Sequence, residues 1–204
     1  MEHTKKIIMT ALFASLTCAA TFVIKIPTPT MGYIHPGDAL VLLSGALLGP
    51  FYGALAAGIG SALSDLFAGY MVYVPATALI KGICAAIAGW SIHLGPISSA
   101  DIFHGKEKDA ASASHSFFST PLFKLIIGGG VSEILMVLGY FLFEIFLLGF
   151  TEGSTAGDYS SSISSGIVAA STSIPFNIVQ GVFGVVIASI LYPLLSRIVR
   201  SASE

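Results

Sequence analysis

Long apolar stretches, separated by short polar or proline-rich segments, run along the whole chain. They lie at about residues 5–25, 37–48, 50–69, 75–93, 120–150 and 165–197. All but the second are long enough for an α-helix that crosses a membrane, which takes roughly 20 residues. The pattern therefore predicts an all-α integral membrane protein, with residues 1–204 forming a single membrane domain. The first stretch is longer than the apolar core of a signal peptide, so we expect an uncleaved span.

The segments between these stretches lack the features of spanning helices. Residues 26–36 contain three prolines, which remove backbone donors and restrict the residues before them, so this segment predicts a re-entrant-like, Pro-rich outer loop. Residues 94–119 are polar and include the charge cluster at 106–109, and residues 151–165 are rich in Ser and Gly. Neither segment has the composition to bury a core of its own, so both are predicted to be loops, the first of them cytoplasmic.

The second and third stretches form either one overlong helix or a hairpin that turns at Gly49-Pro50, and positive charge favours the hairpin. A hairpin gives six spans and places the termini on one side together with most of the basic residues. Those residues are Lys5, Lys6, Lys106, Lys108, Lys124, Arg197 and Arg200. The opposite loops, 26–36, 70–74 and 151–165, contain no Lys or Arg. The positive-inside rule therefore predicts six transmembrane helices with both termini cytoplasmic, whereas a single long helix would give five.

Composition narrows the function classes. Charged residues make up 10% of the chain and hydrophobic residues 54%, whereas a soluble domain has roughly 25% charged residues. No phosphate-binding loop, zinc-protease or hydrolase motif is present in the sequence. We therefore expect no enzyme activity, no cofactor in this chain and no nucleic-acid partner. Cys18 and Cys84 lie in apolar runs, which is typical of buried apolar side chains rather than metal ligands.

Polar residues at membrane depth are the candidates for function, because a polar group is costly there. Lys81 in the fourth helix and Glu144 in the fifth lie at the same depth, roughly 9 Å below the outer boundary, so they can face each other. Asp65 is a rival partner for Lys81, and a structural ion pair is as reasonable as a ligand contact. Glu133 falls on the same helical face as Glu144 but deeper, where packing, coupling and no visible role are all open.

Asn177 and Gln180 follow Pro175 in the sixth helix, three residues apart. Their amides offer donors and acceptors to an uncharged polar ligand, or they satisfy the backbone beside the proline. Loop residues gather on the same outer side, namely Tyr33, His35, Tyr70, Tyr73 and Tyr159. Each tyrosine alone is typical of an interface anchor. Together with the polar helix residues, they predict an outward-facing pocket for a small molecule.

Small residues recur at four-residue spacing on the first helix, at Ala11, Ser15 and Ala19. Such rows let helix backbones approach closely inside a membrane. They serve either packing within the bundle or contact with another protein.

Several ordered motifs carry a resemblance to a known family. They are Met9-Thr-Ala-Leu-Phe-Ala14, Ile26-Pro-Thr-Pro, Gly32-Tyr33-Ile34, Pro36-Gly-Asp38-Ala, Gly49-Pro50, Gly60-Ser-Ala-Leu-Ser-Asp65-Leu and Ile80-Lys81-Gly82. In this order they resemble the substrate-binding S components of energy-coupling factor (ECF) transporters, the bacterial vitamin importers, and in particular the branch of riboflavin-type and related small-vitamin binders. Residues 94–170 match only in hydropathy, and the loop at 94–119 is longer than the family pattern.

The resemblance implies a subunit of the cell membrane that captures a vitamin from outside without transforming it. Its partners would be a membrane coupling (T) protein and two cytoplasmic ATPases, which use the ATP. The family's coupling-protein contact maps onto Ala11, Ser15 and Ala19, and its substrate site maps onto the outer side described above. Because Lys81, Glu144, Asn177 and Gln180 form a mixed and modest polar set, pyridoxine or a hydroxymethylpyrimidine is favoured. Riboflavin and pantothenate stay open.

Two alternatives remain at the level of the sequence. A self-sufficient, proton-coupled secondary transporter would use Glu133 and Glu144 as a relay along the fifth helix. A membrane scaffold without a ligand would use the polar residues only for packing.

Overall fold

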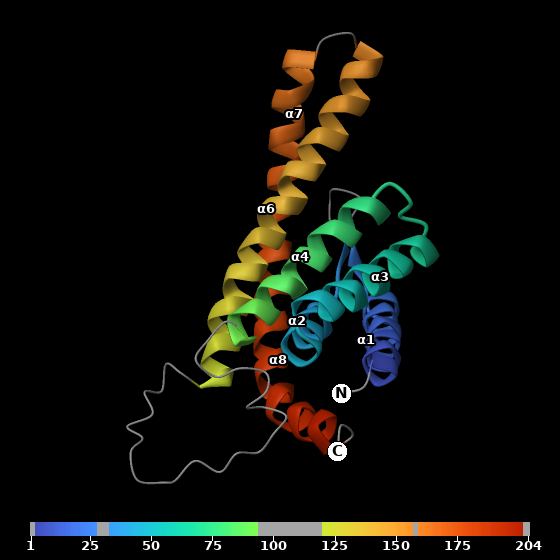
Figure 1. Cartoon of the computed structure of the whole chain (residues 1–204). Helices are drawn as coiled ribbons and strands as arrows, with labels where there is room; N and C mark the ends of the chain where they lie inside the picture. The colour runs from blue at the N-terminus through green and yellow to red at the C-terminus, as the bar shows by residue number, and fades with distance from the viewer. Residues whose placement is uncertain (1–2, 28–32, 94–119, 157–158, 202–204) are drawn as a thin grey trace.

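The computed structural model describes residues 3–27, 33–93, 120–156 and 159–201. This part of the chain is a bundle of helices with one short strand pair (Figure 1). The elements in order are α1 (His3–Val23), β1 (Ile26–Pro27), β2 (Tyr33–Ile34), α2 (Asp38–Leu48), α3 (Pro50–Ala68), α4 (Val74–His93), α6 (Pro121–Ala156), α7 (Tyr159–Ser171) and α8 (Ile174–Ser201). The two strands pair antiparallel, with Ile26 opposite Ile34. The expected loop at 94–119 and most of the Pro-rich loop lie outside the described residues.

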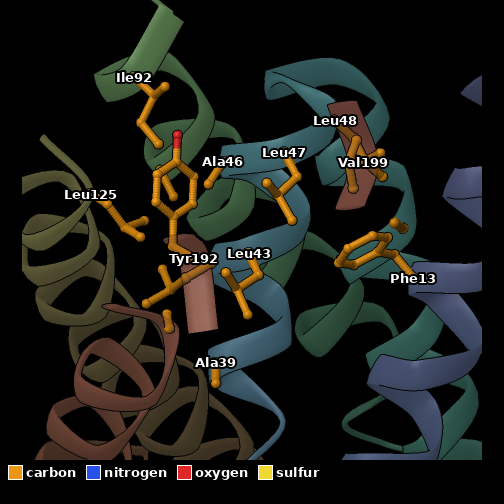
Figure 2. Packing of buried hydrophobic residues seen from close by; sticks show 14 of the residues in the cluster. Phe13, Ala39, Leu43, Ala46, Leu47, Leu48, Ile92, Leu125, Tyr192 and Val199 are labelled. Carbon is orange, nitrogen blue, oxygen red and sulfur yellow. The ribbon is translucent and has the colours of Figure 1, made fainter. Parts of the chain in front are cut away.

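The short second helix lies at the centre of the bundle. It packs against α1, α3, α4 and α8, and all of its residues except Leu40 are buried. A helix that is apolar on every side is stable only when protein surrounds it, which explains this position. Figure 2 shows Leu43, Ala46 and Leu47 of α2 beside Tyr192 of α8 and Ile92 of α4. With 11 residues, α2 is about 16 Å long, so it falls short of a bilayer core of roughly 30 Å.

The chain turns sharply between α2 and α3. Gly49 has a φ of 85°, a conformation that favours glycine, and Pro50 starts α3 at the position where a missing N–H costs nothing. The hairpin is therefore the correct alternative of the two that the sequence allowed.

Five of the described helices are long and apolar enough to cross a membrane: α1, α3, α4, α6 and α8. The expected six membrane-spanning helices include α2, which is too short to cross a membrane by itself. The start of α1, the start of α6 and the end of α8 lie at the same end of the bundle (Figure 1). Large apolar side chains are exposed on the outer surfaces of these helices, as lipid contact requires; examples are Leu12, Phe51, Leu79, Leu142 and Ile190.

The structure differs from the sequence-based expectation around residues 150–175. The described residues of the Ser- and Gly-rich segment 151–165 are helical and not a loop, because α6 continues to Ala156 and α7 begins at Tyr159. The expected single helix at 165–197 is divided, and α8 starts only at Ile174. Helix α7 packs along α6, and a Cβ added to Gly166 would lie 3.2 Å from the backbone N of Gly149. This close packing outweighs the weak helix propensity of serine.

Candidate functional site

Lys81 forms a buried ion pair with Asp38. The Lys81 ammonium donates to Oδ1 of Asp38, and both side chains are about 1% exposed. Lys81 lies on α4, whereas Asp38 is the first residue of α2, where the helix dipole favours a negative charge. The predicted partners of Lys81, Glu144 and Asp65, are therefore wrong. Sequence reasoning missed the role of Asp38, although a lone acid at the start of an apolar helix was a usable signal.

Gln180 extends this ion pair into a network. Its Nε2 donates to Oδ2 of Asp38 at 2.7 Å, and its Oε1 accepts from the backbone N of His35 at 2.8 Å. The amide of Gln180 thus both donates and accepts a hydrogen bond. These two bonds link α8 to α2 and to the segment before α2. We call Asp38, Lys81, Gln180 and the His35 backbone the Asp38 network.

His35 lies outside the spanning helices, half-buried above the Asp38 network. Its Nδ1 accepts from the backbone N of Gly37 at 3.1 Å. Burial lowers the pKa of His35 to about 4; the nearby Asp38 carboxylate partly opposes this effect, and the Lys81 ammonium adds to it. The imidazole is therefore neutral at neutral pH, as an accepting Nδ1 requires.

Glu144 belongs to a second, separate group of polar side chains. Ser173, in the break between α7 and α8, donates from Oγ to Oε2 of Glu144 at 2.5 Å. Tyr73, just before α4, donates more weakly to Oε1 at 3.5 Å. Burial, followed by the Glu144 charge, raises the pKa of Tyr73 above its usual value. We call these three residues the Glu144 cluster.

One face of α8 links the two groups. Ser173, Asn177 and Gln180 are spaced by four and three residues, so they share a helical face, and all three are buried. The backbone N of Asn177 donates to the carbonyl O of Ser173 at 3.0 Å. The amide of Asn177 thus lies along α8 between the Glu144 cluster and the Asp38 network.

Two glycines of α8 make room for carboxylates on neighbouring helices. A Cβ added to Gly184 would lie 2.8 Å from the Cβ of Asp38, and one added to Gly181 would lie 2.9 Å from the Cβ of Glu133. Glu133 is buried on α6 behind Gly181, and the side-chain group that reaches its carboxyl among the described residues is the carboxyl of Asp38. It interacts electrostatically with both Asp38 and Lys81. Sequence analysis singled out Glu133 but neither of the two glycines.

The predicted pocket residues line two cavities rather than one. A cavity of about 240 Å³ between the end of α1 and α8 is lined by His35, Pro36, Gln180 and Phe183, among others. A wider one of about 710 Å³ lies between the α3–α4 turn and α6, and Tyr70 and Tyr73 line it. The side chains of Tyr33 and Tyr159 lie outside the described part of the structure, so their predicted contacts have no counterpart here.

The row of small residues on α1 faces outward. Ala11, Ser15 and Ala19 are exposed, whereas Phe13 and Thr17 are buried against the bundle. The row therefore does not serve packing between the helices of this chain.

Comparisons with known proteins point to one family. The family model described as "ECF-type riboflavin transporter, S component" matches residues 1–197. A protein of Pyrococcus woesei, described as "Uncharacterized protein in gap 3'region", is 30% identical over 151 residues, which cover 72% of this chain and 84% of the relative. The structure described as "Structure and mechanism of the S component of a bacterial ECF transporter" covers 97% of this chain and 98% of its own, with a TM-score of 0.55 and 20% identity. The last of these similarities concerns the fold alone.

Proposed function

The chain belongs to the family of ECF-type riboflavin transporter S components, and we propose that it captures a small vitamin at the outer face of the cell membrane. One observation carries the proposal for the site: polar side chains from segments far apart in the sequence are buried together in one half of the bundle. A buried polar group is costly in a membrane, so such a concentration favours a ligand site. S components are transport subunits, which agrees with the expectation of no enzyme activity.

The ligand would lie against α8, in the cavity of about 240 Å³ that His35 and Gln180 line. We assign direct contacts to His35 and Gln180, which line this cavity, and the sequence adds Asn177, Glu144, Tyr73 and Tyr33 as further candidates. Lys81 has a different role in this proposal. Because its ammonium is fully buried against Asp38, it positions Gln180 through that carboxylate instead of touching the ligand.

The identity of the vitamin is the finer part of the proposal. The description of the family names riboflavin, whereas the modest polar set favours a smaller ring such as pyridoxine or a hydroxymethylpyrimidine. The cavity of about 240 Å³ beside Gln180 and His35 has room for a small ring compound. All of these vitamins, and pantothenate, belong in the first binding screen.

We further propose that uptake depends on partners. The exposed row Ala11, Ser15 and Ala19 would contact a membrane coupling (T) protein, and two cytoplasmic ATPases would supply the energy from ATP. The end of the bundle where α1 begins and α8 ends carries Lys5, Lys6 and Arg197, and under the positive-inside rule this end would face the cytoplasm. The vitamin would then enter from the opposite end.

A screen of the purified protein against a vitamin panel tests the site, with thermal shift and native mass spectrometry as the measurements. We expect saturable binding with a Kd below about a micromolar for one vitamin. Asn177→Ala and Glu144→Gln should weaken it. Ser189→Ala is the matched control, because that hydroxyl donates to the carbonyl O of Val185 in its own helix. Unchanged affinity in both site variants would remove the assignment.

A second experiment tests the energy source. Uptake in cells should stop when ATP is depleted and should persist when only the proton gradient is collapsed. The reverse result would favour a proton-coupled carrier that uses Glu133 and Glu144.

A further inference from the structure

Two buried carboxyl groups meet where α2 begins beside α6. Glu133 of α6 is 6% exposed, and its carboxyl reaches that of Asp38, which is fully buried. Gly181 of α8 lies against the same group, since a Cβ added there would be 3.2 Å from Oε2 of Glu133. Two carboxyl groups in contact at low dielectric do not both ionise, because like charges repel strongly there. One of the two therefore holds a proton.

The hydrogen bonds of Asp38 show which carboxyl is ionised. Its Oδ1 accepts from the Lys81 ammonium and its Oδ2 from Nε2 of Gln180, and both donors stabilise the charged form. Lys81 is the one buried Lys or Arg among the described residues, and its ion pair is with Asp38. A carboxylate has about four lone-pair sites, so Asp38 can also accept from a protonated Glu133. The proton therefore belongs to Glu133.

The other groups around Glu133 are consistent with this assignment. Lys81 and Cys84, both on α4, are the further titratable side chains that interact with it. The Cys84 thiol donates to the carbonyl O of Ser132 at 3.3 Å, so it is protonated and adds no charge. Helix α8 contributes the uncharged Gly181 at this level.

A groove between α6 and α8 leads from Glu133 to the outer surface of the bundle. It has a volume of about 340 Å³, and apart from Glu133 its lining residues are apolar or glycine. Ile134 and Val182, which line it, are 63% and 58% exposed on the surface that contacts lipid. Glu133 lies about 18 Å along α6 from Pro121, so the groove opens within the hydrocarbon core. A molecule dissolved in the bilayer can reach the carboxyl by this route.

We propose that Glu133 is a proton-binding site open to the bilayer, where its carboxylic acid donates to the Asp38 carboxylate and apolar reagents reach it through the groove. The proton takes the place of a second cation, so Asp38, Lys81 and Glu133 together carry no net charge. This inference does not depend on the proposed function, because it concerns the bundle itself.

The site suits an apolar carbodiimide, a class of reagent that adds to protonated carboxylic acids. The acid proton moves to one carbodiimide nitrogen, and a carboxyl oxygen bonds to the central carbon. The resulting O-acylisourea rearranges to a stable N-acylurea, so no group leaves and no further reactant is needed.

Infrared spectroscopy of the protein in lipid vesicles at neutral pH tests the proton. Glu133→Gln should remove a C=O stretching band of a protonated carboxylic acid and leave the carboxylate bands unchanged. The amide of this variant can still donate to Asp38, so the melting temperature should stay within about 4 °C of that of the unmodified protein. Loss of a carboxylate band in place of the acid band would show that Glu133 is ionised and would overturn the proposal.

Labelling in the same vesicles tests the route from the bilayer. Dicyclohexylcarbodiimide should modify Glu133 at least about tenfold more than a water-soluble carbodiimide does, as peptide mass spectrometry can resolve. Val182→Phe fills part of the groove and should lower the labelling, whereas Ile190→Phe, on the exposed surface of α8 outside the groove, should not. No adduct on Glu133 of the unmodified protein, or equal labelling of the two variants, overturns the opening to the bilayer. Neither result affects the proposed function.

Discussion

Lys81 on α4 donates to Asp38 at the start of α2, and the pair is closed off from solvent and lipid alike. The contact joins two helices 43 residues apart in the sequence, and the Asp38 network is built around it. Two kinds of consequence follow, for the stability of the bundle and for the geometry of the proposed site.

The first prediction concerns the ion pair itself. Lys81→Met or Asp38→Asn leaves one charge or polar group buried without its partner, so each should lower the free energy of unfolding by about 3–5 kcal/mol. The double variant removes both charges and should lose clearly less than the sum of the two. Denaturant unfolding in detergent, analysed as a double-mutant cycle, measures the coupling. Additive losses would mean that the two side chains do not interact.

The second prediction concerns the amide bridge. Gln180→Leu leaves the His35 N–H and Oδ2 of Asp38 without the partner they have here, which should destabilise the protein by about 1–3 kcal/mol. It should also weaken vitamin binding, because the segment before α2 loses its link to α8. Affinity is measured by titration with the vitamin found in the screen. Ile190→Val, an exposed change on the same helix, should affect neither quantity.

The third prediction uses a pair of glycines. A methyl group at Gly184 would meet the Cβ of Asp38 at 2.8 Å, so Gly184→Ala should cost about 1–3 kcal/mol through overpacking. Nothing lies within 4 Å of the same position at Gly130 on α6, so Gly130→Ala should be neutral or slightly stabilising. The two unfolding curves, recorded under the same conditions, make the comparison. Equal effects would contradict the close approach of α8 to Asp38.

The fourth prediction follows from His35. Its pKa is 6.5 in its ordinary state and about 4 in the folded protein, so the unfolded chain binds the extra proton first as the pH falls. The stability contributed by neutral His35 is therefore complete above about pH 6.5 and is lost progressively down to about pH 4. The melting temperature should fall over this range more steeply in the unmodified protein than in His35→Gln. Parallel curves for the two proteins would rule out this residue as the cause.

The fifth prediction concerns the partner surface on α1. Ser15→Phe places a bulky ring in the exposed row of small residues, so it should prevent assembly with the coupling protein while leaving vitamin binding intact. Leu16→Phe is the control, because it is also exposed on α1 but lies beside the row. Co-purification with the coupling protein and the ATPases gives the readout. Normal assembly of Ser15→Phe would place the contact elsewhere.

The helices themselves could be predicted from the sequence, because lipid imposes a simple requirement of apolar length on each span. The turn at Gly49-Pro50 was also accessible, since both residue types have a narrow backbone preference. The partner of Lys81 could not be predicted from the sequence. Depth along a helix can be counted in residues, but which neighbouring helix a side chain faces depends on packing between elements. The apolar run after Asp38 indicates that this helix is enclosed by protein, but it does not tell which neighbouring side chain meets the acid.

The helical pair α6 and α7 shows that a segment with the composition of a loop can form helices. Serine and glycine between residues 151 and 165 are typical of loops when read locally. In the structure the same small residues let α7 lie close to α6, so a long-range contact reverses the local preference. The split between α7 and α8 also places Ser173 where its hydroxyl reaches Glu144, a contact that a continuous helix at 165–197 would not have indicated.

Enclosure of α2 has a consequence for how the protein is made. A helix of 11 residues that starts with a buried acid is a poor substrate for independent insertion into a bilayer, because it neither spans the hydrocarbon nor satisfies Asp38 by itself. We expect α2 to insert together with α3 as a hairpin. Asp38 then gains its partner Lys81 only when α4 has also been inserted. We therefore expect stable insertion of α2 to require α3 and α4 together, since a chain truncated before α4 lacks the Lys81 partner of Asp38.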